Sequence, residues 1–230
     1  MNNMPEEKGC KVITPRPQIV LDALGKGNRF SLFGAGTYAG NVKQMAQEGY
    51  QPSVSREGVY LVSLALEHPE DQVLAEIVRS FNNNWIQLGR IVRGREGVYV
   101  NPPKDESGEF VLDERRLIDL TSEDVEGVRY GENGLAFAPY DSFKQGVQSA
   151  NDFAKSGLAK AIEFSKSGNA SKLADIAKKQ RRKEVNVWGF NRVDSPVLKV
   201  LTLYSYSGRL HVDGGDWDDD SDGCAFGVLS

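Results

Sequence analysis

The sequence predicts a compact α+β fold. Strand-like apolar segments lie near both ends of the 230-residue chain, and the segments between them have the apolar period of helices. The clearest helix spans 69–81, where a proline opens the segment, acidic residues follow and apolar side chains form a stripe. No internal repeat of about 20–50 residues is present. Strands at both ends with helices between them are typical of a compact domain, and a chain of this length with 40% hydrophobic residues can bury a core.

The first half of the chain alternates short apolar segments with proline and glycine. Three prolines break residues 1–18, which we expect to be irregular. The apolar pattern then predicts a helix over 19–24, a strand over 30–33, a helix over 41–48, a buried strand over 59–65, the helix over 69–81, and a hairpin of two strands over 85–92 and 97–100. Residues 102–108 are expected to form a loop, and 109–135 an acidic insertion with a short helix. We assign 1–55 to an N-terminal extension or the first part of the domain, and 56–230 to the main domain.

The second half continues this alternation and ends on a strand. It predicts helices over 142–153, 158–165 and 171–179, and strands over 185–190, 197–203 and 225–229. Leu210 and Val212 alternate with polar neighbours, which is the two-residue period of a half-exposed strand. Trp85 and Trp188 lie within strand segments, so we expect them to be scaffold aromatics.

The charge of the chain is unevenly spread. The formal net charge is −4, and residues 204–230 hold six aspartates and one arginine, a balance of −5, so the remaining residues sum to +1. The short basic run 178–183 ends an amphipathic helix, where cations complement the helix dipole. Because an acidic segment repels phosphate groups, we expect no nucleic-acid partner.

We expect neither a secretory signal nor a membrane-spanning segment. No apolar run approaches the roughly 18 residues of a membrane-spanning helix, so we expect no membrane span. The N-terminus is polar and lacks the apolar centre of a secretory signal, which predicts a cytoplasmic protein or one that reaches a virion or cell surface by another route. Cys10 and Cys224 fit no metal spacing, and we expect separate thiols, with a disulfide between them as the alternative. The sequence leaves the oligomeric state open.

A glycine-rich stretch suggests one alternative function. Gly34, Gly36 and Gly40 follow a strand segment and precede a helix, as in turns that hold a pyrophosphate at a helix N-terminus. Their spacing is a weaker variant of the dinucleotide fingerprint, and no acidic residue ends a second parallel strand about 20 residues later. We therefore expect a structural turn, and a nucleotide-binding enzyme that uses Gly34–Gly40 is the alternative.

Acidic residues near the C-terminus suggest a second alternative. Asp218, Asp220, Asp222 and Gly223 match the first half of a calcium loop, in which several carboxylates bind one hard cation. Leu229 occupies the position where such a loop needs a glutamate, and strands flank the segment. We expect no metal site, and a calcium-dependent lectin is the further alternative.

Catalytic groups are sparse. Of the two histidines, His68 precedes a helix-opening proline and His211 lies in a polar segment near the C-terminus. Ser207, His211 and Asp213 are the residue types of a hydrolase triad, but strand spacing directs them to one face without convergence. We therefore expect no enzymatic activity and no cofactor.

The segment 204–224 mixes polar and apolar residues in a regular way. Seventeen of its 21 residues are Asp, Gly, Ser, Tyr, Arg or His, and the other four are Leu210, Val212, Trp217 and Cys224. Tyrosine and small polar residues are the types that antibody paratopes favour, because they combine rigid contact area with adaptable hydrogen bonding. An apolar run, 224–229, closes the chain. The pattern predicts an exposed binding surface held on buried anchors.

Residues 185–230 also resemble the C-terminal variable segment of diversity-generating retroelement proteins, and they are most similar to the archaeal and phage-associated branch. In that family a reverse transcriptase-driven process rewrites adenines, so that asparagine codons scatter into codons for polar residues, glycine and tyrosine. The resemblance implies a C-type-lectin-like fold of the subtype shared with formylglycine-generating enzymes, with mixed or antiparallel sheets, helices and insertions. It also implies a protein or glycan target of unknown identity. The implied variable ligand-binding positions are Tyr204, Tyr206, Gly208, Arg209, His211, Asp213, Gly214, Gly215, Asp216, Asp218, Asp219, Asp220, Ser221 and Asp222.

Overall fold

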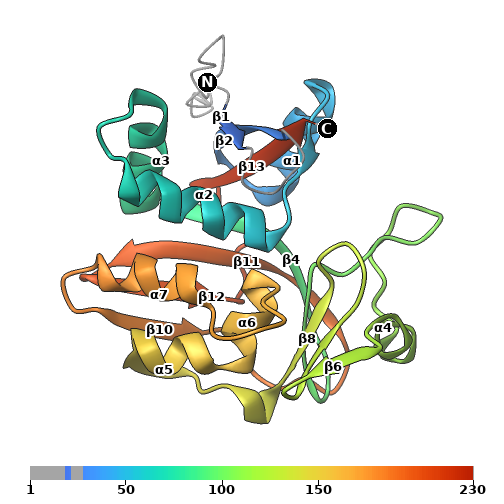
Figure 1. Cartoon of the computed structure of the whole chain (residues 1–230). Helices are drawn as coiled ribbons and strands as arrows, with labels where there is room; N and C mark the ends of the chain where they lie inside the picture. The colour runs from blue at the N-terminus through green and yellow to red at the C-terminus, as the bar shows by residue number, and fades with distance from the viewer. Residues whose placement is uncertain (1–18, 22–27, 230) are drawn as a thin grey trace, which may run out of the picture.

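A long mixed sheet carries the fold, with helices packed against it (Figure 1). The computed structural model describes residues 19–21 and 28–229. The helices are α1 (Tyr38–Gln47), α2 (Ser55–Glu67), α3 (Gln72–Asn83), α4 (Glu114–Leu120), α5 (Ala150–Lys155), α6 (Gly157–Glu163) and α7 (Ser171–Lys178). The strands are β1 (Ile19–Leu21), β2 (Asn28–Gly36), β3 (Gln51–Pro52), β4 (Trp85–Arg93), β5 (Gly97–Val100), β6 (Glu123–Val125), β7 (Val128–Tyr130), β8 (Ala136–Pro139), β9 (Gly146–Ser149), β10 (Glu184–Trp188), β11 (Val197–Tyr206), β12 (Arg209–Asp213) and β13 (Gly223–Leu229).

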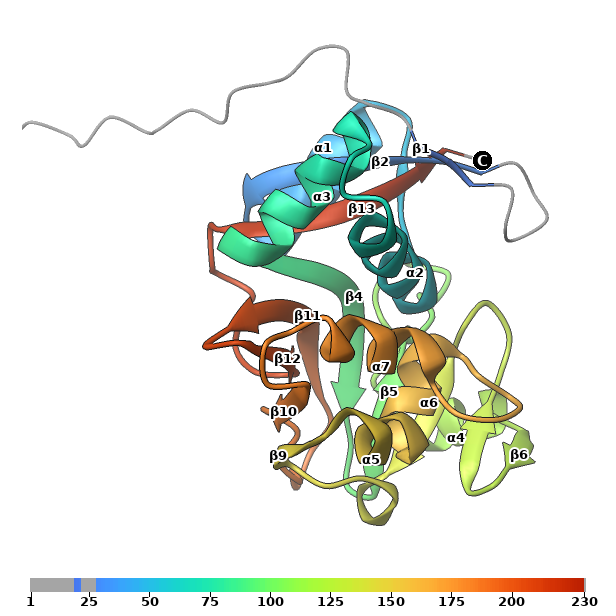
Figure 2. The same ribbon diagram turned by 60° about the vertical axis from the view of Figure 1, so that its left-hand side comes forward.

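The sheet joins segments from both ends of the chain. Its main path runs β6-β7-β8-β5-β4-β11-β12-β10-β9. Strand β13 pairs parallel with β4 and antiparallel with β2 and β3, and β2 and β13 lie side by side in both views (Figures 1 and 2). Strands β2 and β3 therefore belong to the same sheet as the C-terminal strand β13.

One large core cluster lies between the sheet and the helices. Apolar side chains of α2, α3 and β4 pack in it with those of α5, α6 and α7. Helix α2 approaches the sheet so closely at Gly58 that a Cβ atom there would lie 2.6 Å from Leu88 and 3.6 Å from Phe226. Glycine at this position lets the helix backbone meet β4 and β13 directly.

Several sequence predictions are correct in type. The strand predicted over 30–33 and the helix predicted over 41–48 lie within β2 and largely within α1. The predicted hairpin over 85–100 is formed by β4 and β5, which pair antiparallel. The insertion 109–135 contains the expected short helix, α4, and also an unpredicted hairpin of β6 and β7.

The strand predicted over 59–65 is wrong, because these residues form the middle of α2. Val59, Leu61, Val62 and Ala65 are all fully buried, so the run is apolar without a helical period. A short buried helix segment and a buried strand have the same apolar pattern. The local start signal lies upstream, where the Glu57 carboxylate accepts a hydrogen bond from the Val54 amide at 3.0 Å.

Two further predictions need correction. The helix predicted over 19–24 is wrong at Ile19–Leu21, which form β1 and pair with β2, while 22–27 lie outside the described residues. The helix predicted over 142–153 begins only at Ala150, because Gly146–Ser149 form β9 and pair with β10. In both places pairing with a distant strand outweighs the local preference of the sequence for helix. In the described parts of the chain, none of the helices has the length and apolar character to cross a membrane.

Candidate functional site

The polar segment near the C-terminus forms a hairpin and a loop on the sheet. Tyr204–Tyr206 end β11, and Tyr206 pairs with Arg209 at the start of β12, so a two-residue turn joins the strands. The turn residues Ser207 and Gly208 have φ angles of 52° and 72°. Positive φ angles at both central positions of a two-residue turn match the twist of a hairpin. Because such angles are strained for residues with a side chain, glycine is well suited to position 208. Residues 214–222 then form a loop that leads into β13.

Strand pairing assembles one continuous surface from β9, β10, β12 and β11. His211 lies opposite Tyr204 on one side and Asn186 on the other, and Val147 lies opposite Asn186. Side chains that are directly opposite share a face of the sheet. We call this surface the outer sheet face, and its residues are Val147, Asn186, Trp188, Thr202, Tyr204, Tyr206, Arg209, His211 and Asp213.

The opposite face of the same strands is apolar. Val185, Val187, Leu210 and Val212 are fully buried in the core cluster. Helices α5 and α7 lie against this side of β10 (Figure 1). The predicted anchors Leu210 and Val212 are therefore confirmed as core residues, and the outer sheet face is the opposite side of the same strands.

Aromatic rings dominate the outer sheet face and its edge. Tyr204 stacks on His211 with ring centroids 4.7 Å apart and planes 21° apart. Trp85 contacts Tyr204 edge-on at 5.0 Å and Trp217 at 4.5 Å. Tyr206 lies at the edge of this cluster, against His211, and is 66% exposed. The cluster holds loop and sheet together, and Tyr206 remains available for contact.

The loop 214–222 is tied to the sheet through its carboxylates. Asp218 forms an ion pair with Arg90, and Asp216 forms one with Lys199. An oxygen of Asp220 accepts hydrogen bonds from the Trp85 indole and from the Asp222 amide, both at 2.9 Å. These aspartates therefore point to separate partners rather than to one centre.

This arrangement disfavours the calcium alternative. A calcium ion needs several oxygen ligands around one point. Within residues 28–229, His, Cys, Asp and Glu side chains form no group of three or more that could hold a metal ion. Asp219, Ser221 and Asp222 are exposed at the tip of the loop.

The strand predicted at 209–213 is confirmed as β12, but its predicted half exposure is wrong, because residues 210–213 are all buried. His211 is 9% exposed, and burial lowers the pKa of its imidazole. Asp213 is 1% exposed, and burial raises the pKa of its carboxyl group. Gly214 is also buried. The rings of Tyr204 and Tyr206 cover His211, which a sequence pattern does not reveal.

Asp213 supports the loop. One of its oxygens accepts a hydrogen bond from the Gly215 amide at 2.8 Å, and the other lies 3.5 Å from the Tyr204 hydroxyl, which donates to it. We expect Asp213→Ala to lower the free energy of unfolding by about 1–3 kcal/mol, because buried donors lose their acceptor. Chemical denaturation measures this loss. Asp219→Ala is the control, and its exposed side chain predicts a change within about 0.5 kcal/mol. Equal stabilities of the two variants would contradict a supporting role for Asp213.

The glycine stretch does not form a phosphate-binding turn. Gly34 and Gly36 lie within β2, whose described partners β1 and β13 are both antiparallel to it. Helix α1 begins two residues after the strand, and the Thr37 hydroxyl caps it by accepting from the Gly40 amide at 3.0 Å. The turn expected over Gly34–Gly40 is therefore wrong, and the parallel crossover of a dinucleotide site is not formed here. The nucleotide-binding alternative is not favoured.

Two exposed apolar side chains of the outer sheet face were not expected from the sequence. Trp188, predicted to be a scaffold residue, is 63% exposed, and Val147 is 51% exposed. Trp188 lies beside Asp213 because β10 and β12 are parallel. The sequence carries a signal for this exposure. Val185 and Val187 point into the core, and because side chains alternate along a strand, Trp188 points to the opposite face. Trp85 differs, because its ring is part of the aromatic cluster that holds the loop.

The mixed sheet that joins segments from both ends of the chain, with helices packed against it, has the architecture of a C-type lectin fold of the α+β class. A solved structure described as "Accommodation of massive sequence variation in Nanoarchaeota by the C-type lectin fold" superposes with a TM-score of 0.54. The two are 13% identical, and the match covers 94% of this chain and 99% of that chain. This likeness confirms the predicted fold. No protein-family model matches the chain, and no curated protein matches it either.

Proposed function

We propose that the chain is a non-enzymatic ligand-binding protein, and that the outer sheet face and the loop 214–222 form its recognition surface. We further propose that a retroelement diversifies the exposed positions of the segment 204–224. The observation that carries the proposal is the division of this segment into two sets. Leu210, Val212 and Cys224 are buried and hold the fold, whereas Tyr206 and the loop tip are exposed.

The chemistry of the exposed set favours recognition of a macromolecule. Tyr206 and Trp188 offer large rigid contact areas at low entropic cost. Asp219 and Asp222 add negative charge on the loop 214–222. Such a surface is complementary to a protein or glycan target that carries basic groups, because complementary charge steers association and excludes wrong partners.

The C-type lectin fold supports this proposal in general terms. The superposed solved structure is described as accommodating massive sequence variation on the same fold. Exposed positions on a rigid sheet tolerate substitution at little cost in stability. A fold that keeps its anchors inward can therefore present many different outward sequences.

Two libraries of variants test the proposal. The first randomises Tyr206, Arg209, Asp219, Ser221 and Asp222, and the second randomises Thr202, Leu210, Val212, Asp213 and Gly214. We expect most members of the first library to fold and to yield binders when selected against a panel of proteins and glycans. We expect most members of the second to unfold, since these positions are buried. A first library that mostly fails to fold, or folds without yielding any binder, contradicts the proposed surface.

The retroelement part of the proposal has its own test in the genome. We expect a near-identical repeat of the coding sequence for the C-terminal segment, next to a reverse transcriptase gene. The repeat and the coding sequence should differ mainly at adenines. Absence of such a repeat from the genome would contradict the proposal of retroelement diversification. The proposed recognition surface would still be tested by the two libraries.

Trp188 lies outside the proposed diversified segment and provides a further prediction. In binders selected from the first library, we expect Trp188→Ala to weaken target binding at least tenfold in most clones, because exposed aromatic residues at interfaces are frequent hot spots. Surface plasmon resonance measures the affinities. Ile118→Ala, which truncates a 43% exposed side chain on α4, is the control and should leave binding unchanged. Unchanged affinity in the Trp188 variants would place this residue outside the recognition surface.

A further inference from the structure

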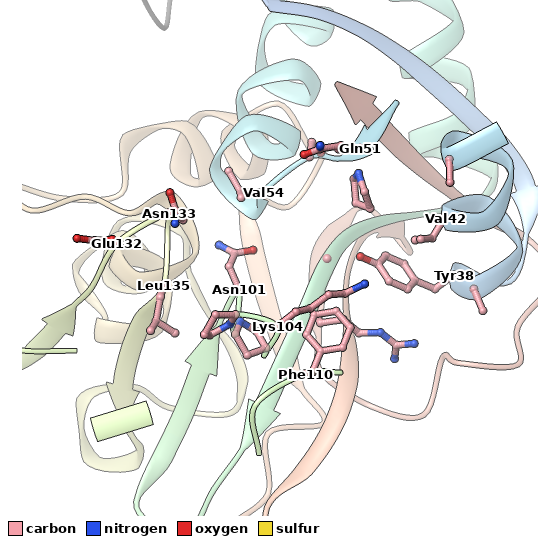
Figure 3. A pocket seen from close by; sticks show the side chains of 18 of the residues that line it. Tyr38, Val42, Gln51, Val54, Asn101, Lys104, Phe110, Glu132, Asn133 and Leu135 are labelled. Carbon is pink, nitrogen blue, oxygen red and sulfur yellow. The ribbon is translucent and has the colours of Figure 1, made fainter. Parts of the chain in front are cut away.

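A large groove lies between α1, the start of α2 and the segment 101–135 (Figure 3). Its volume is about 1060 Å³. Binding sites for small molecules typically have volumes of about 300–1,000 Å³. The groove is therefore large enough for a small organic molecule, and the proposed recognition surface does not use it.

The walls of the groove are largely apolar. Val42 of α1 and Val54 line it on one side, and Pro102, Phe110 and Leu135 line it on the other. The labelled side chains of Val42, Val54 and Leu135 surround the open space in Figure 3. Apolar walls of this kind favour the body of an apolar or aromatic ligand, whose transfer from water is favourable.

Positive charge is concentrated on the groove. Its lining contains four cationic side chains, Lys43, Arg90, Lys104 and Arg116, and one carboxylate, Glu132, a balance of +3. The whole chain has a net charge of −4. The groove therefore differs in sign from the rest of the molecule and attracts anions.

Polar groups converge at one end of the groove. In Figure 3 the Tyr38 hydroxyl and the Lys104 ammonium point into the same space. Burial raises the pKa of Tyr38 to about 12, so its hydroxyl keeps its proton at neutral pH and can donate a hydrogen bond to an anion. The Arg90 guanidinium lies over the Tyr38 ring at 4.7 Å from its centroid.

Arg90 connects the groove to the loop 214–222. It lines the groove and forms the ion pair with Asp218. Its Nε atom is buried and has no hydrogen-bond partner among the described residues. An anion in the groove would therefore compete with Asp218 for the same guanidinium.

From this geometry we infer that the groove is a second binding site, and that its ligand is a small organic anion with an apolar body and a carboxylate or sulfonate group. Lys104 and Tyr38 bind the anionic group, and the walls formed by Val42, Phe110 and Leu135 hold the apolar body. Asp218 weakens binding by neutralising Arg90. The site depends on the groove alone and does not require that the segment 204–224 be diversified.

Fluorescence titration of the full chain with 8-anilinonaphthalene-1-sulfonate tests the site. This probe combines an aromatic body with a sulfonate, and N-phenyl-1-naphthylamine is its neutral counterpart. We expect saturable binding of one sulfonate probe per chain, displacement by decanoate and at least tenfold weaker binding of the neutral probe. Equal binding of the two probes would contradict an anion site.

Three variants connect the binding to the groove. We expect Lys104→Glu to weaken sulfonate binding about tenfold or more, and Asp218→Ala to strengthen it several-fold by releasing Arg90. Lys144→Glu makes the same charge change at an exposed lysine outside the groove and should leave binding unchanged. Circular dichroism of each variant ensures that the probe reports a folded chain.

Two results would overturn the inference. Equal weakening by Lys104→Glu and Lys144→Glu would show that only net charge matters. Displacement of the probe by a peptide of alternating glutamate and leucine, but not by decanoate, would assign the groove to an acidic peptide instead. Neither result affects the library test of the recognition surface, so the two proposals fail separately.

Discussion

Replacing Phe226 with alanine is expected to lower the free energy of unfolding by about 3–5 kcal/mol. Phe226 is 1% exposed and lies in the main core cluster. It belongs to β13, the strand that pairs with β2, β3 and β4 and so joins both ends of the chain. Truncation would open a cavity where helix α2 packs most closely on the sheet, at Gly58. The backbone of a sheet strand cannot move inward to fill that cavity without breaking its pairing.

Urea denaturation followed by circular dichroism measures this loss. Tyr206→Ala is the matched control, because it also truncates an aromatic side chain on a strand, but one that is 66% exposed. We expect a change within about 0.5 kcal/mol for the control. Similar losses for the two variants would mean that Tyr206 supports the fold, and it would then be unsuited to a variable surface.

The anchors of the C-terminal segment could be predicted from the sequence because their signal is local. Leu210 and Val212 alternate with polar residues, and the apolar run from Cys224 ends the chain. A two-residue apolar period has few interpretations other than a strand with one buried face. The structure buries Leu210, Val212 and Phe226, as the pattern predicts.

The exposure of the polar positions could not be predicted because it depends on pairing between distant segments. Composition alone does not distinguish Asp213 from Asp219. In the structure Asp213 is buried and accepts a hydrogen bond from the loop, whereas Asp219 is exposed. Asp218 is held by Arg90, which is 128 positions away in the chain. The parallel pairing of β10 with β12 likewise places Trp188 opposite Asp213, which is 25 positions later in the chain.

Helix α2 could not be predicted from the sequence for a different reason. Its residues 59–65 are apolar except Ser63, and the helix packs against the sheet, α3, α6 and α7. An enclosed helix loses the polar stripe that distinguishes it from a strand. The helix is recognisable only from its start, where Glu57 bonds to the backbone of Val54.

Stability is expected to fall between about pH 4.5 and pH 7 because of Glu163. This residue ends α6, and its carboxyl oxygens accept hydrogen bonds from the Leu173 amide at 2.6 Å and the Lys172 amide at 3.3 Å. Burial raises its pKa from 4.5 to about 7, although the two amides oppose the shift. The folded state therefore keeps the proton longer than the unfolded state does.

The sign of the effect follows from proton binding. Below about pH 4.5 the carboxyl group is protonated in both states, and the full stability is present. As the pH rises, the unfolded state ionises first, so the free energy of unfolding decreases until the folded state also ionises near pH 7. A shift of this size corresponds to a loss of about 3 kcal/mol.

Glu163→Gln isolates this contribution, because glutamine does not ionise and its carbonyl oxygen can still accept from the Leu173 amide. Urea denaturation of both proteins from pH 4 to pH 8 gives the difference in stability at each pH, and the titrations of His211 and Asp213 cancel in that difference. We expect the variant to gain about 3 kcal/mol relative to the parent chain as the pH rises through this range. A difference that stays constant from pH 4 to pH 8 would show that Glu163 is ionised at its ordinary pKa, and that the start of α7 binds its charge well enough to offset burial.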